Sequence, residues 1–448
     1  MRISVIGTGY LGATHAACMA ELGHEVIGLD VDPLKVEALS SGVVPFHEPG
    51  LEEMIERHVS SGRLRFTTDY KEVGGWADVH FIGVGTPQSA ESGAADLTYV
   101  DAAVDSLAEH ISRDALVVGK STVPVGTAAR LSTRFESRRQ GKTGTVRLAW
   151  NPEFLREGFA IQDTLQPDRI VVGLENDEDE APLREVYQAA VEAGTPWITT
   201  DFATAELVKV AANAFLATKI SFINAFAELM ETTGGNITTL ADAIGLDARI
   251  GRRFLNAGLG FGGGCLPKDI RALRARADEL GHADSMAFLR EVDAINGRRR
   301  DRAVHLAQQE LDRTADRRQR DGRPARVAVL GAAFKPNSDD TRDSPALAVA
   351  RALLHAGAEV TVYDPQAGQR AVEQTPGLEL SPTLDDALNG ADLMLLLTEW
   401  QEFRDLDPRR VAALMAQPVA IDGRNVLDPA VWTAGGVRLL TLGRKTDQ

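Results

Sequence analysis

The chain has 448 residues, 44% of them hydrophobic and 25% charged, with a formal net charge of −16. A chain of this length exceeds one compact domain, so we expect two or three. The acidic balance opposes binding to nucleic acid, whose phosphates attract clustered lysine and arginine, and no such partner is expected. No stretch approaches ~18 uncharged apolar residues, which predicts no membrane-spanning segment and no membrane partner.

The cysteine content and the amino-terminal segment both indicate a cytoplasmic protein. The chain holds two cysteines, Cys18 and Cys265, too few for a disulfide framework and typical of a reducing compartment. The first residues, "MRISVIGTGYLG", enter a strand-like run without the charged, apolar and small-residue regions of a secretion signal. We therefore expect a cytoplasmic protein whose partner is a small molecule.

Short apolar runs alternate with amphipathic stretches over roughly the first 200 residues. Such runs are typical of buried parallel strands, and helices between them complete the βαβ units of a doubly wound sheet. The predicted strands are residues 2–7, 24–30, 78–85, 115–121, 146–152 and 169–174.

The pattern changes at about Thr204, where helical periodicity continues for nearly thirty residues without proline or glycine, long enough to span a domain. More helix follows to about residue 312, and "DRRQRDGRPA" at 316–325 then predicts a linker or loop. A second α/β unit begins at 326–336, with further strands at 358–364, 391–398 and 418–423. We therefore predict an α/β protein of two Rossmann-like doubly wound domains, 1–203 and 313–448, joined by a central helical domain, 204–312, with one long helix.

The first chemical signal is "GTGYLG" at 7–12, which closes a strand and opens a helix. Gly7 permits the tight turn, Gly9 lets the backbone approach a pyrophosphate, and Gly12 allows close helix packing. The next strand ends at Asp30, whose carboxylate would accept the adenosine ribose hydroxyls and repel a 2′-phosphate, which favours NAD over NADP. The alternative interpretation is a tight turn followed by a surface aspartate.

The second α/β unit lacks that fingerprint. Its first strand runs into "VLGAAFK" at 329–335, which has one glycine and ends in Lys335, while "VYD" at 362–364 again ends a strand in an acid. We interpret this half as a nucleotide-scale binding fold without the dinucleotide loop, in which Lys335 binds a phosphate or nucleotide of the substrate. The alternative is a structural lysine at a strand end.

The loop "GFGGGCLPKD" at 260–269 contains the second cysteine. If Pro267 occupies the first turn of a helix, the helix dipole and Lys268 favour the thiolate of Cys265, and Asp269 could face the same direction. The three glycines have no expected packing role, so we interpret them as allowing a substrate to approach the backbone. The alternative, a buried structural cysteine, suits Cys18 better.

A nucleophilic thiol beside a dinucleotide site suits the oxidation of an alcohol to an acid, in which a thiohemiacetal gives up the second hydride and water hydrolyses the thioester. Such chemistry needs donors for the developing oxyanion and carboxylates or water to move protons. Candidates at suitable spacings and strand ends are Lys209 and Asn213, Glu153 and Glu157, and Thr122.

Motifs in order along nearly the whole chain resemble the UDP-glucose 6-dehydrogenases, of the UDP-glucose/GDP-mannose dehydrogenase family. They are "GTGYLG", "PFHEPGLEEM", "GVGTP", "KSTVPVGT", "NPEFLREG", "ELVKVAANAFLATKISFIN", "RIGRRFLNAGLGFGGGCLPKD" and "FKPNSDDTRDSPA". The resemblance implies four-electron oxidation of the C6 alcohol of a nucleotide-linked sugar to a carboxylate, with two NAD and no metal. It further implies an NAD-binding first domain, a central domain that carries the catalytic lysine and cysteine and forms a homodimer through its long helix, and a nucleotide-sugar-binding third domain.

The resemblance also assigns roles to individual residues. Cys265 matches the nucleophile, Lys209 and Asn213 the oxyanion pair, Asp269 and Thr122 the partners of a catalytic water, and Glu157 the acid for proton transfer and thioester hydrolysis. Cofactor positions are Gly7, Gly9, Tyr10, Leu11, Gly12, Asp30, Lys35, Thr86, Thr122, Glu157, Lys268 and Arg342. Substrate positions are Glu153, Phe154, Leu155, Lys209, Asn213, Arg249, which would reach across a dimer, Phe254, Gly262, Cys265, Phe334 and Lys335.

Three departures from the family pattern bear on substrate choice: Gly264 where serine is common, Ala225 where glutamate is frequent, and Phe254 where some members have tyrosine. UDP-glucose is the expected substrate, with dTDP-glucose or GDP-mannose as alternatives for the same chemistry. Two other classes of function stay open at this point. A two-electron dehydrogenase would release one NADH per substrate, and a non-catalytic nucleotide-sugar-binding regulator would have no need of the thiol.

Overall fold

The computed structural model describes residues 1–89, 93–313, 315 and 322–445. The chain forms two compact units, one of Met1–Ala212 with Arg271–Ala283 and the other of Asn213–Ile270 with Asp284–Gln448. Two helices, α10 (Phe202–Thr233) and α12 (Leu266–Glu279), contribute residues to both units. The division into three domains by function stays a prediction.

The first unit contains an eight-stranded sheet in the order β3-β2-β1-β4-β5-β6-β7-β8. Strands β1 to β6 are parallel and follow the order 3-2-1-4-5-6 of a dinucleotide-binding sheet. The bounds are β1 Arg2–Ile6, β2 Glu25–Leu29, β3 Leu64–Thr67, β4 Val79–Ile82, β5 Ala115–Gly119, β6 Val146–Trp150, β7 Ile170–Gly173 and β8 Trp197–Thr200.

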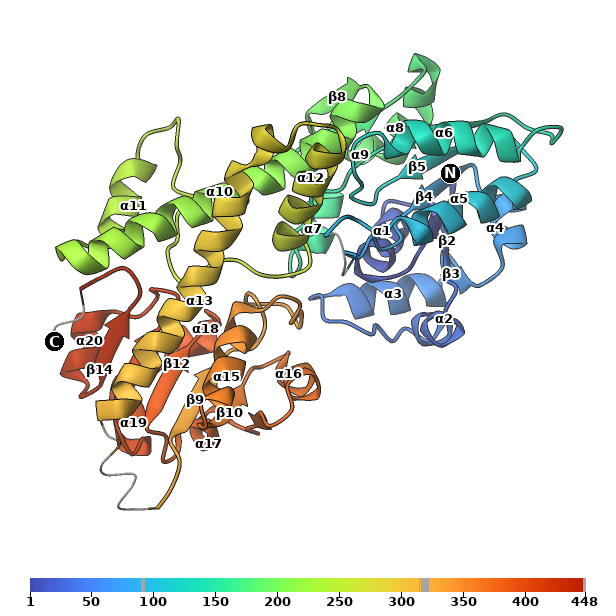
Figure 1. The fold of residues 1–448 in the computed structure, drawn as a ribbon. Coiled ribbons are helices and arrows are strands. Elements are labelled where there is room, and N and C mark those ends of the chain that lie inside the picture. Colours follow the sequence, from blue (N-terminus) through green and yellow to red (C-terminus); the bar gives the residue numbers. More distant parts are fainter. Residues whose placement is uncertain (90–92, 314, 316–321, 446–448) are drawn as a thin grey trace. The chain divides into compact units, whose positions relative to one another are not determined.

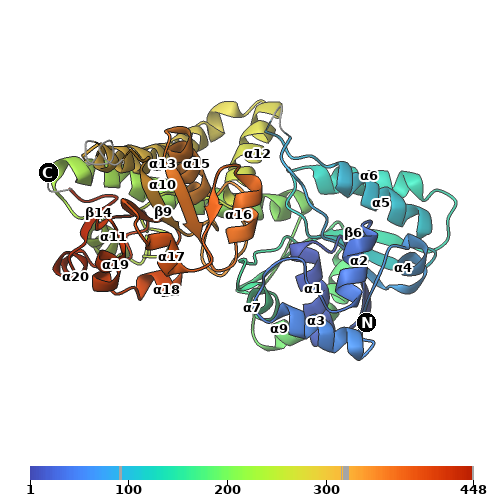
Figure 2. The same ribbon diagram turned by 90° about the horizontal axis from the view of Figure 1, so that it is seen from below.

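Helices cover both faces of this sheet, as Figures 1 and 2 show. Alternate residues of β1 therefore enter different cores: Ile3 and Val5 pack with α1, while Ile6 packs with α5 and α6. One face carries α1 (Tyr10–Glu21), α3 (Leu51–Ser60) and α7 (Ala160–Leu165), and the other carries α4 (Tyr70–Trp76), α5 (Thr98–His110) and α6 (Thr127–Arg138). Further helices of this unit are α2 (Pro33–Ser40), α8 (Glu180–Val186) and α9 (Gln188–Glu192).

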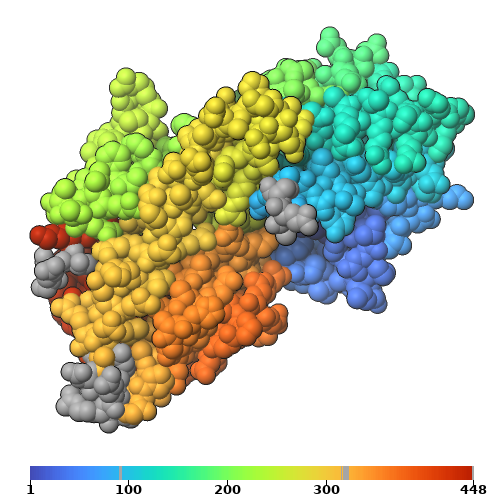
Figure 3. All heavy atoms as spheres, in the orientation of Figure 1, coloured from blue at the N-terminus to red at the C-terminus, as the bar shows by residue number. Residues whose placement is uncertain are grey.

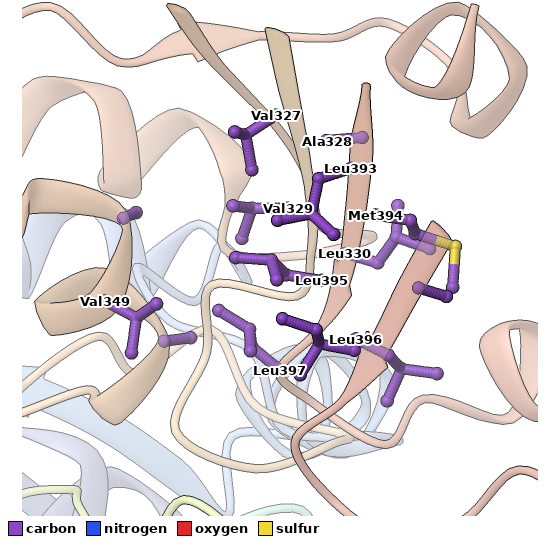
Figure 4. Close-up of a cluster of buried hydrophobic side chains, with 14 of the residues drawn as sticks. Val327, Ala328, Val329, Leu330, Val349, Leu393, Met394, Leu395, Leu396 and Leu397 are labelled. Carbon is purple, nitrogen blue, oxygen red and sulfur yellow. The ribbon is translucent and has the colours of Figure 1, made fainter. Parts of the chain in front are cut away.

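The second unit contains a six-stranded, wholly parallel sheet in the order β11-β10-β9-β12-β13-β14. This is again the order 3-2-1-4-5-6. The bounds are β9 Arg326–Leu330, β10 Glu359–Tyr363, β11 Glu379–Leu380, β12 Leu393–Leu396, β13 Val419–Asp422 and β14 Arg438–Thr441. Aliphatic side chains of β9 and β12 pack with Val349 of α15 (Pro345–His355), as Figure 4 shows.

Helix α13 (Phe288–Arg313) packs along α15, and their surfaces are continuous in the space-filling view of Figure 3. The remaining helices of the second unit are short, and all but the first of them follow strands β10 to β13. They are α11 (Ile237–Gly245), α16 (Gly368–Gln374), α17 (Leu384–Leu388), α18 (Gln401–Arg404), α19 (Pro408–Leu414) and α20 (Pro429–Ala434).

The predicted fold class is confirmed, and every strand predicted from an apolar run is present. One expectation is wrong: the strand predicted at 169–174, β7, pairs antiparallel with β6 through Trp150 and Gly173. Strands β3, β8, β11 and β14 were not predicted. The long helix begins at Phe202, and α12 begins at Leu266, so Pro267 lies in its first turn as predicted. Of the predicted linker, residues 316–321 lie outside the described residues.

Among the described residues, only α10 is long and apolar enough by length and composition to cross a membrane. Its most apolar window is 44% buried inside the protein. Core helices of globular proteins meet the same criterion, so this helix alone is weak evidence for a membrane span.

Candidate active site

The glycine loop after β1 has the form that a pyrophosphate site requires. Gly7 has φ +86°, and a Cβ on it would lie 2.7 Å from Val84 Cγ1, while a Cβ on Gly12 would lie 1.7 Å from the Gly7 carbonyl oxygen. A Cβ on Gly9, in contrast, would meet nothing within 4 Å. No side chain caps Gly9 at the start of α1, so the amino-terminal dipole of this helix is open to an anion. These features fit NAD.

Asp30 follows β2 and is 6% exposed. Its Oδ2 accepts hydrogen bonds from the Thr8 amide (2.8 Å), the Thr8 hydroxyl (3.0 Å) and Lys35 Nζ (2.9 Å). Burial alone would raise the pKa of Asp30, but the hydrogen bonds from Lys35, Asp32 and Thr8 outweigh burial and hold the pKa below its ordinary value. The predicted cofactor residues Asp30 and Lys35 therefore lie together as an ion pair.

Tyr10, the first residue of α1, connects the glycine loop to the segment that contains Glu157. Its hydroxyl donates to the Glu48 carboxylate and accepts from the Gly158 amide at 3.0 Å. Glu48 also accepts from the amides of Gly158 (2.6 Å) and Ala160 (2.7 Å). Burial, and then the hydrogen bond to Glu48, raises the pKa of Tyr10. Glu48 was missed because an acid in a proline- and glycine-containing loop gives no local sign that it is buried.

Thr86 and Thr122 are also brought together. The hydroxyl of Thr86 donates to the backbone carbonyl of Thr122 at 2.8 Å, and the Ser121 hydroxyl donates to the Val84 carbonyl at 2.6 Å. These two hydrogen bonds connect the segment after β5 to the segment after β4. Both lie at the carboxyl ends of parallel strands, where doubly wound sheets bind their ligands.

Lys209 forms a buried ion pair in the first unit. It is 5% exposed, and its Nζ lies 3.3 Å from Glu153 Oε1 and 5.6 Å from the centre of the Phe154 ring. The Glu153 carboxylate is oriented by the Leu155 amide, which donates to its other oxygen at 2.7 Å. Glu153, one of the two predicted glutamates, therefore pairs with the lysine. Glu157 lies at the edge of the same segment, next to Gly158.

A second buried lysine, Lys120, was not predicted. It follows β5, and its Nζ donates to Asn151 Oδ1 (3.0 Å) and to the Tyr187 hydroxyl (3.2 Å). Burial lowers the pKa of Lys120 to about 8; the charge of Glu153 opposes this effect and that of Lys209 reinforces it. No sequence pattern distinguishes this lysine from a solvated one at a strand end.

The second unit contains a polar cluster around Asp269, a residue that is 2% exposed. Asn213 Nδ2 donates to Asp269 Oδ2 at 2.7 Å, and Lys268 Nζ lies 2.9 Å from Asp269 Oδ1. The Asp269 amide donates to the Cys265 carbonyl at 2.9 Å, so the cysteine immediately precedes the first turn of α12. Cys265 is exposed. Cys18, in contrast, is buried, and burial raises the pKa of its thiol to about 12.

The expectation that the glycines of this loop have no packing role is wrong. A Cβ on Gly262 would lie 2.4 Å from the Asp343 carbonyl oxygen, one on Gly263 2.7 Å from Phe334, and one on Gly264 2.4 Å from the Arg342 guanidinium. The Gly263 amide also donates to the Arg342 carbonyl at 2.9 Å. The loop is therefore packed closely against the 334–343 segment. This contact brings the predicted residues Gly262, Phe334 and Arg342 together.

The other predicted substrate residues are more scattered. Lys335 Nζ lies 5.2 Å from the centre of the Phe334 ring. Phe254 has φ +65° and is 39% exposed, a backbone conformation that is uncommon for a bulky residue. The Arg249 side chain is 89% exposed and pairs with Asp247. Among the described residues, no group of three or more histidine, cysteine, aspartate or glutamate side chains could hold a metal ion.

Three family models together match most of the chain. Residues 1–191 match the "UDP-glucose/GDP-mannose dehydrogenase family, NAD binding domain", residues 203–298 match the central domain, and residues 328–429 match the UDP binding domain. The prediction of NAD as cofactor is confirmed at this level. The UDP binding domain supports a UDP-sugar as the class of substrate.

Curated relatives match over the full chain. UDP-glucose 6-dehydrogenase of Rhizobium meliloti is 42% identical over 446 residues, which cover 99% of this chain and 100% of the relative. UDP-glucose 6-dehydrogenase TuaD of Bacillus subtilis is 39% identical, with 99% of this chain and 93% of the relative covered.

Solved structures agree. A UDP-glucose dehydrogenase from Pyrobaculum islandicum aligns with a TM-score of 0.85 at 40% identity and covers 95% of this chain and 94% of that one. A UDP-D-ManNAc dehydrogenase from Pyrococcus horikoshii aligns with a TM-score of 0.84 at 26% identity over 100% of both chains. The order of the strands, the glycine loop and the full-length identity lead to one conclusion: the chain belongs to the UDP-glucose/GDP-mannose dehydrogenase family.

Proposed function

We propose that this chain oxidises C6 of UDP-glucose to the carboxylate of UDP-glucuronate and reduces two NAD in each turnover. The observation that carries the proposal is the exposed thiol of Cys265 directly before α12, beside the buried Asn213–Asp269–Lys268 cluster. A simple alcohol dehydrogenase has no use for such a thiol. The relatives named UDP-glucose 6-dehydrogenase, at about 40% identity over the full chain, support this choice of sugar nucleotide.

The cofactor would be held by residues of the first unit. The amino terminus of α1 and the backbone at Gly9 would bind the pyrophosphate, Asp30 the ribose, and Tyr10, Leu11, Thr86 and Thr122 the remainder. Glu157, Lys268 and Arg342 are further cofactor candidates. When bound, NAD accepts the hydride that leaves C6 in each of the two oxidation steps.

Cys265 carries the covalent chemistry. Its thiolate attacks C6 of the aldehyde, so that an S–C bond forms and the carbonyl oxygen takes the electron pair as an oxyanion. Loss of hydride from this thiohemiacetal leaves a thioester. Water then adds to C6, the C–S bond breaks, and the thiolate and the carboxylate are released.

The remaining residues supply charge and protons. Lys209 and Asn213, spaced i, i+4 on α10, would donate to the oxyanion, which makes it more stable in the transition state. Asp269 and Thr122 would orient the hydrolytic water, and Glu157 would move protons. Glu153 is a further candidate for proton transfer, because its carboxylate already pairs with Lys209 at 3.3 Å.

The UDP-glucose would contact a second group of residues. Phe154 and Leu155 flank the Glu153 carboxylate, Gly262 and Phe334 pack together, and Lys335 offers a cation for a phosphate. Phe254 and Arg249 complete the set that the family resemblance suggests. The specific identity of the sugar nucleotide is what the first experiment tests.

The test is turnover of a panel of sugar nucleotides, UDP-glucose, dTDP-glucose and GDP-mannose, with NADH counted per sugar consumed. We expect UDP-glucose to be preferred, two NADH per sugar and no free aldehyde. One NADH with trappable aldehyde would instead identify a two-electron dehydrogenase. Cys265→Ala should fold and bind both ligands but make no UDP-glucuronate, whereas Cys18→Ala should retain most activity.

We also propose that the protein is a cytoplasmic homodimer that pairs through α10. Phe215, Phe222 and Leu229 are 67%, 47% and 60% exposed, and their seven-residue spacing places them on one face of the helix. A second copy of α10 would cover this apolar stripe. Sedimentation of the wild type should show a dimer, and Phe222→Asp should shift it to a monomer; a monomeric wild type would contradict the proposal.

A further inference from the structure

Glu206 is a buried carboxylate with no assigned role. It lies on α10 three residues before Lys209 and is 2% exposed. Its Oε2 accepts the Gly126 amide at 2.7 Å, and its Oε1 accepts the Ala128 amide at 2.6 Å. These amides begin α6, whose N-cap residue, Gly126, has φ +93° and no side chain to cap the helix. The cap of α6 is therefore provided by another helix.

The segment that Glu206 holds is the one that begins at Thr122. At its start, the Thr86 hydroxyl donates to the Thr122 carbonyl at 2.8 Å. In its middle, Arg276 of α12 donates to the Val125 carbonyl at 3.0 Å. At its end come the two amides bound by Glu206. Hydrogen bonds to three different parts of the chain therefore hold residues 122–128. Those at the carboxyl-terminal end of the segment are made with α10, the helix that carries Lys209.

A cap for α6 alone would not require this arrangement. Many helices are capped within their own segment by a serine, threonine or aspartate at the N-cap position, without a link to a second helix. Burial raises the pKa of Glu206, and the amides of Ala128, Gly126 and Thr127, together with the charge of Arg276, oppose that shift. Because both oxygens of a buried carboxylate on α10 bind amides at the start of α6, the side chain links α10 to the 122–128 segment as well as capping a helix.

We propose that Glu206 is a positioning residue, which holds the Thr122 segment in register with the helix that carries Lys209. The inference rests on the proposed function, in which Thr122 orients a catalytic water and contacts the cofactor. Both of its carboxylate oxygens bind backbone amides, so we assign Glu206 no contact with substrate or cofactor. It acts through the backbone amides of Gly126 and Ala128.

The variant that tests this is Glu206→Gln, which preserves size but replaces one oxygen by an NH2 group. Both backbone partners are donors, so the new NH2 would face one of their N–H groups and release the segment. A displacement of about 1 Å can reduce rate by about 100-fold, and we expect kcat to fall by about 10- to 100-fold. The KM for UDP-glucose should stay within about threefold. Glu206→Asp, which keeps both oxygens, should recover part of kcat and carries the test if the glutamine variant does not fold.

Asp392→Asn serves as the matched control. Asp392 is also a buried carboxylate that accepts a backbone amide, that of Arg326 at 3.0 Å, and it pairs with Arg323 at 2.7 Å, but it lies before β12 in the second unit. The control should lose a similar amount of thermal stability while its kcat per folded molecule stays at the wild-type value. Equal losses of kcat in both variants would mean that Glu206 acts only on stability and would overturn the inference.

A double variant shows whether Glu206 acts through Thr122. In a Thr122→Ala background, Glu206→Gln should reduce kcat by less than threefold, because the group it positions is already gone. Full additivity of the two effects, or wild-type kcat in folded Glu206→Gln, would overturn the inference. Failure of the proposed function is distinguishable, because the wild type itself would then not convert UDP-glucose to UDP-glucuronate.

Discussion

The first six strands of the two sheets share one parallel topology, but the sheets differ in the segment that connects the first strand to the next helix. In each sheet a glycine in the left-handed region directly follows that strand, Gly7 with φ +86° and Gly331 with φ +99°. In each, its amide donates to the last residue of the second strand, Leu29 at 2.7 Å and Tyr363 at 2.8 Å. The turn itself is therefore the same in both sheets.

The next helix differs. After Gly7, α1 begins at Tyr10 with no side-chain cap. After Gly331, α15 begins only at Pro345 and is capped by Ser344, whose oxygen accepts the Leu347 amide at 3.3 Å. The amide groups at the start of α1 are therefore available to a pyrophosphate, whereas an amide in the first turn of α15 is already bound by the Ser344 side chain.

The comparison teaches that a dinucleotide site is a property of a few loop residues and not of the doubly wound sheet. The same strand order supports an NAD binding domain and a UDP binding domain in one chain. Three pairs of substitutions would break or sharpen this contrast.

The largest effects are expected at the glycines. Gly9→Val places a side chain in open space at φ −70°, so the fold should persist while the KM for NAD rises about 100-fold or more, because the backbone no longer reaches the pyrophosphate. Gly331→Ala places a Cβ 2.4 Å from Thr398 Cβ at positive φ and should lower the free energy of unfolding by about 2–4 kcal/mol. Steady-state kinetics and denaturant unfolding of both variants measure the two outcomes.

Gly331→Ala should leave the KM for NAD unchanged. If instead Gly9→Val unfolded the protein and kept NAD affinity in the remaining folded fraction, Gly9 would be a packing glycine like the others, and the contrast between the two loops would fail.

Much of this arrangement was predictable from the sequence, because the central strands are continuous apolar runs. Strands β8 and β11 were missed because they are short and partly solvated: Ile198 and Leu380 are 47% and 42% exposed, which removes the hydrophobic signal. The direction of β7 was also not predictable, since an apolar run carries no information about parallel or antiparallel pairing.

Local geometry was predictable where the motif itself creates it, as at Gly7, Asp30 and Cys265. It was not predictable where distant partners decide it. Nothing in the local sequence distinguishes three of the buried residues from ordinary solvated ones: Glu206, Glu48 and Lys120. They are buried only by tertiary contacts. The glycines at 262–264 were misinterpreted for the same reason, because the side chains that crowd them come from the 334–343 segment, far along the chain.

Buried charges near the strand ends give the second prediction, with opposite pH dependence in the two sheets. After β5, burial lowers the pKa of Lys120 to about 8 from 10.5. Between about pH 8 and pH 10.5 the unfolded chain binds the lysine proton more tightly than the native state does. The free energy of unfolding of the wild type therefore rises with pH over this range, by up to about 3 kcal/mol relative to that of Lys120→Met. At the end of β13, burial raises the pKa of Asp422 above its ordinary value of 3.8. The native state therefore binds the proton more tightly, and the free energy of unfolding falls as pH rises from the ordinary carboxyl pKa to the raised one.

The free energy of unfolding is measured by denaturant across pH for the wild type, Lys120→Met and Asp422→Asn. Subtracting the wild-type value from that of each variant isolates the contribution of the replaced group. The difference for Lys120 should be constant below about pH 8 and shrink above it. The difference for Asp422 should appear only as pH rises above the ordinary range of a carboxyl group. A pH-independent difference in either case would mean that the group titrates normally in the native state.

The smallest effects are expected at the two acids that end the second strands. Both Asp364 oxygens accept backbone amides, Oδ2 from Ala332 at 2.7 Å and Oδ1 from Ala367 at 2.7 Å, and Oδ2 also accepts Trp400 Nε1 at 3.1 Å. The protein itself therefore uses the hydrogen-bonding capacity of this carboxylate. Asp364→Asn should lower the free energy of unfolding by roughly 1.5 kcal/mol and leave the KM for NAD unchanged.

Asp30 differs in how its oxygens are used. Its Oδ2 serves Thr8 and Lys35, but its Oδ1 accepts only the Asp32 amide, at 3.1 Å, among the hydrogen bonds of the described residues. A carboxylate oxygen can accept more than one donor, so Oδ1 has capacity for a ribose hydroxyl. Asp30→Asn should therefore raise the KM for NAD by about tenfold, roughly 1.4 kcal/mol, with the KM for UDP-glucose unchanged. Equal effects of Asp30→Asn and Asp364→Asn on the KM for NAD would place the cofactor at both sheets and end the distinction between them.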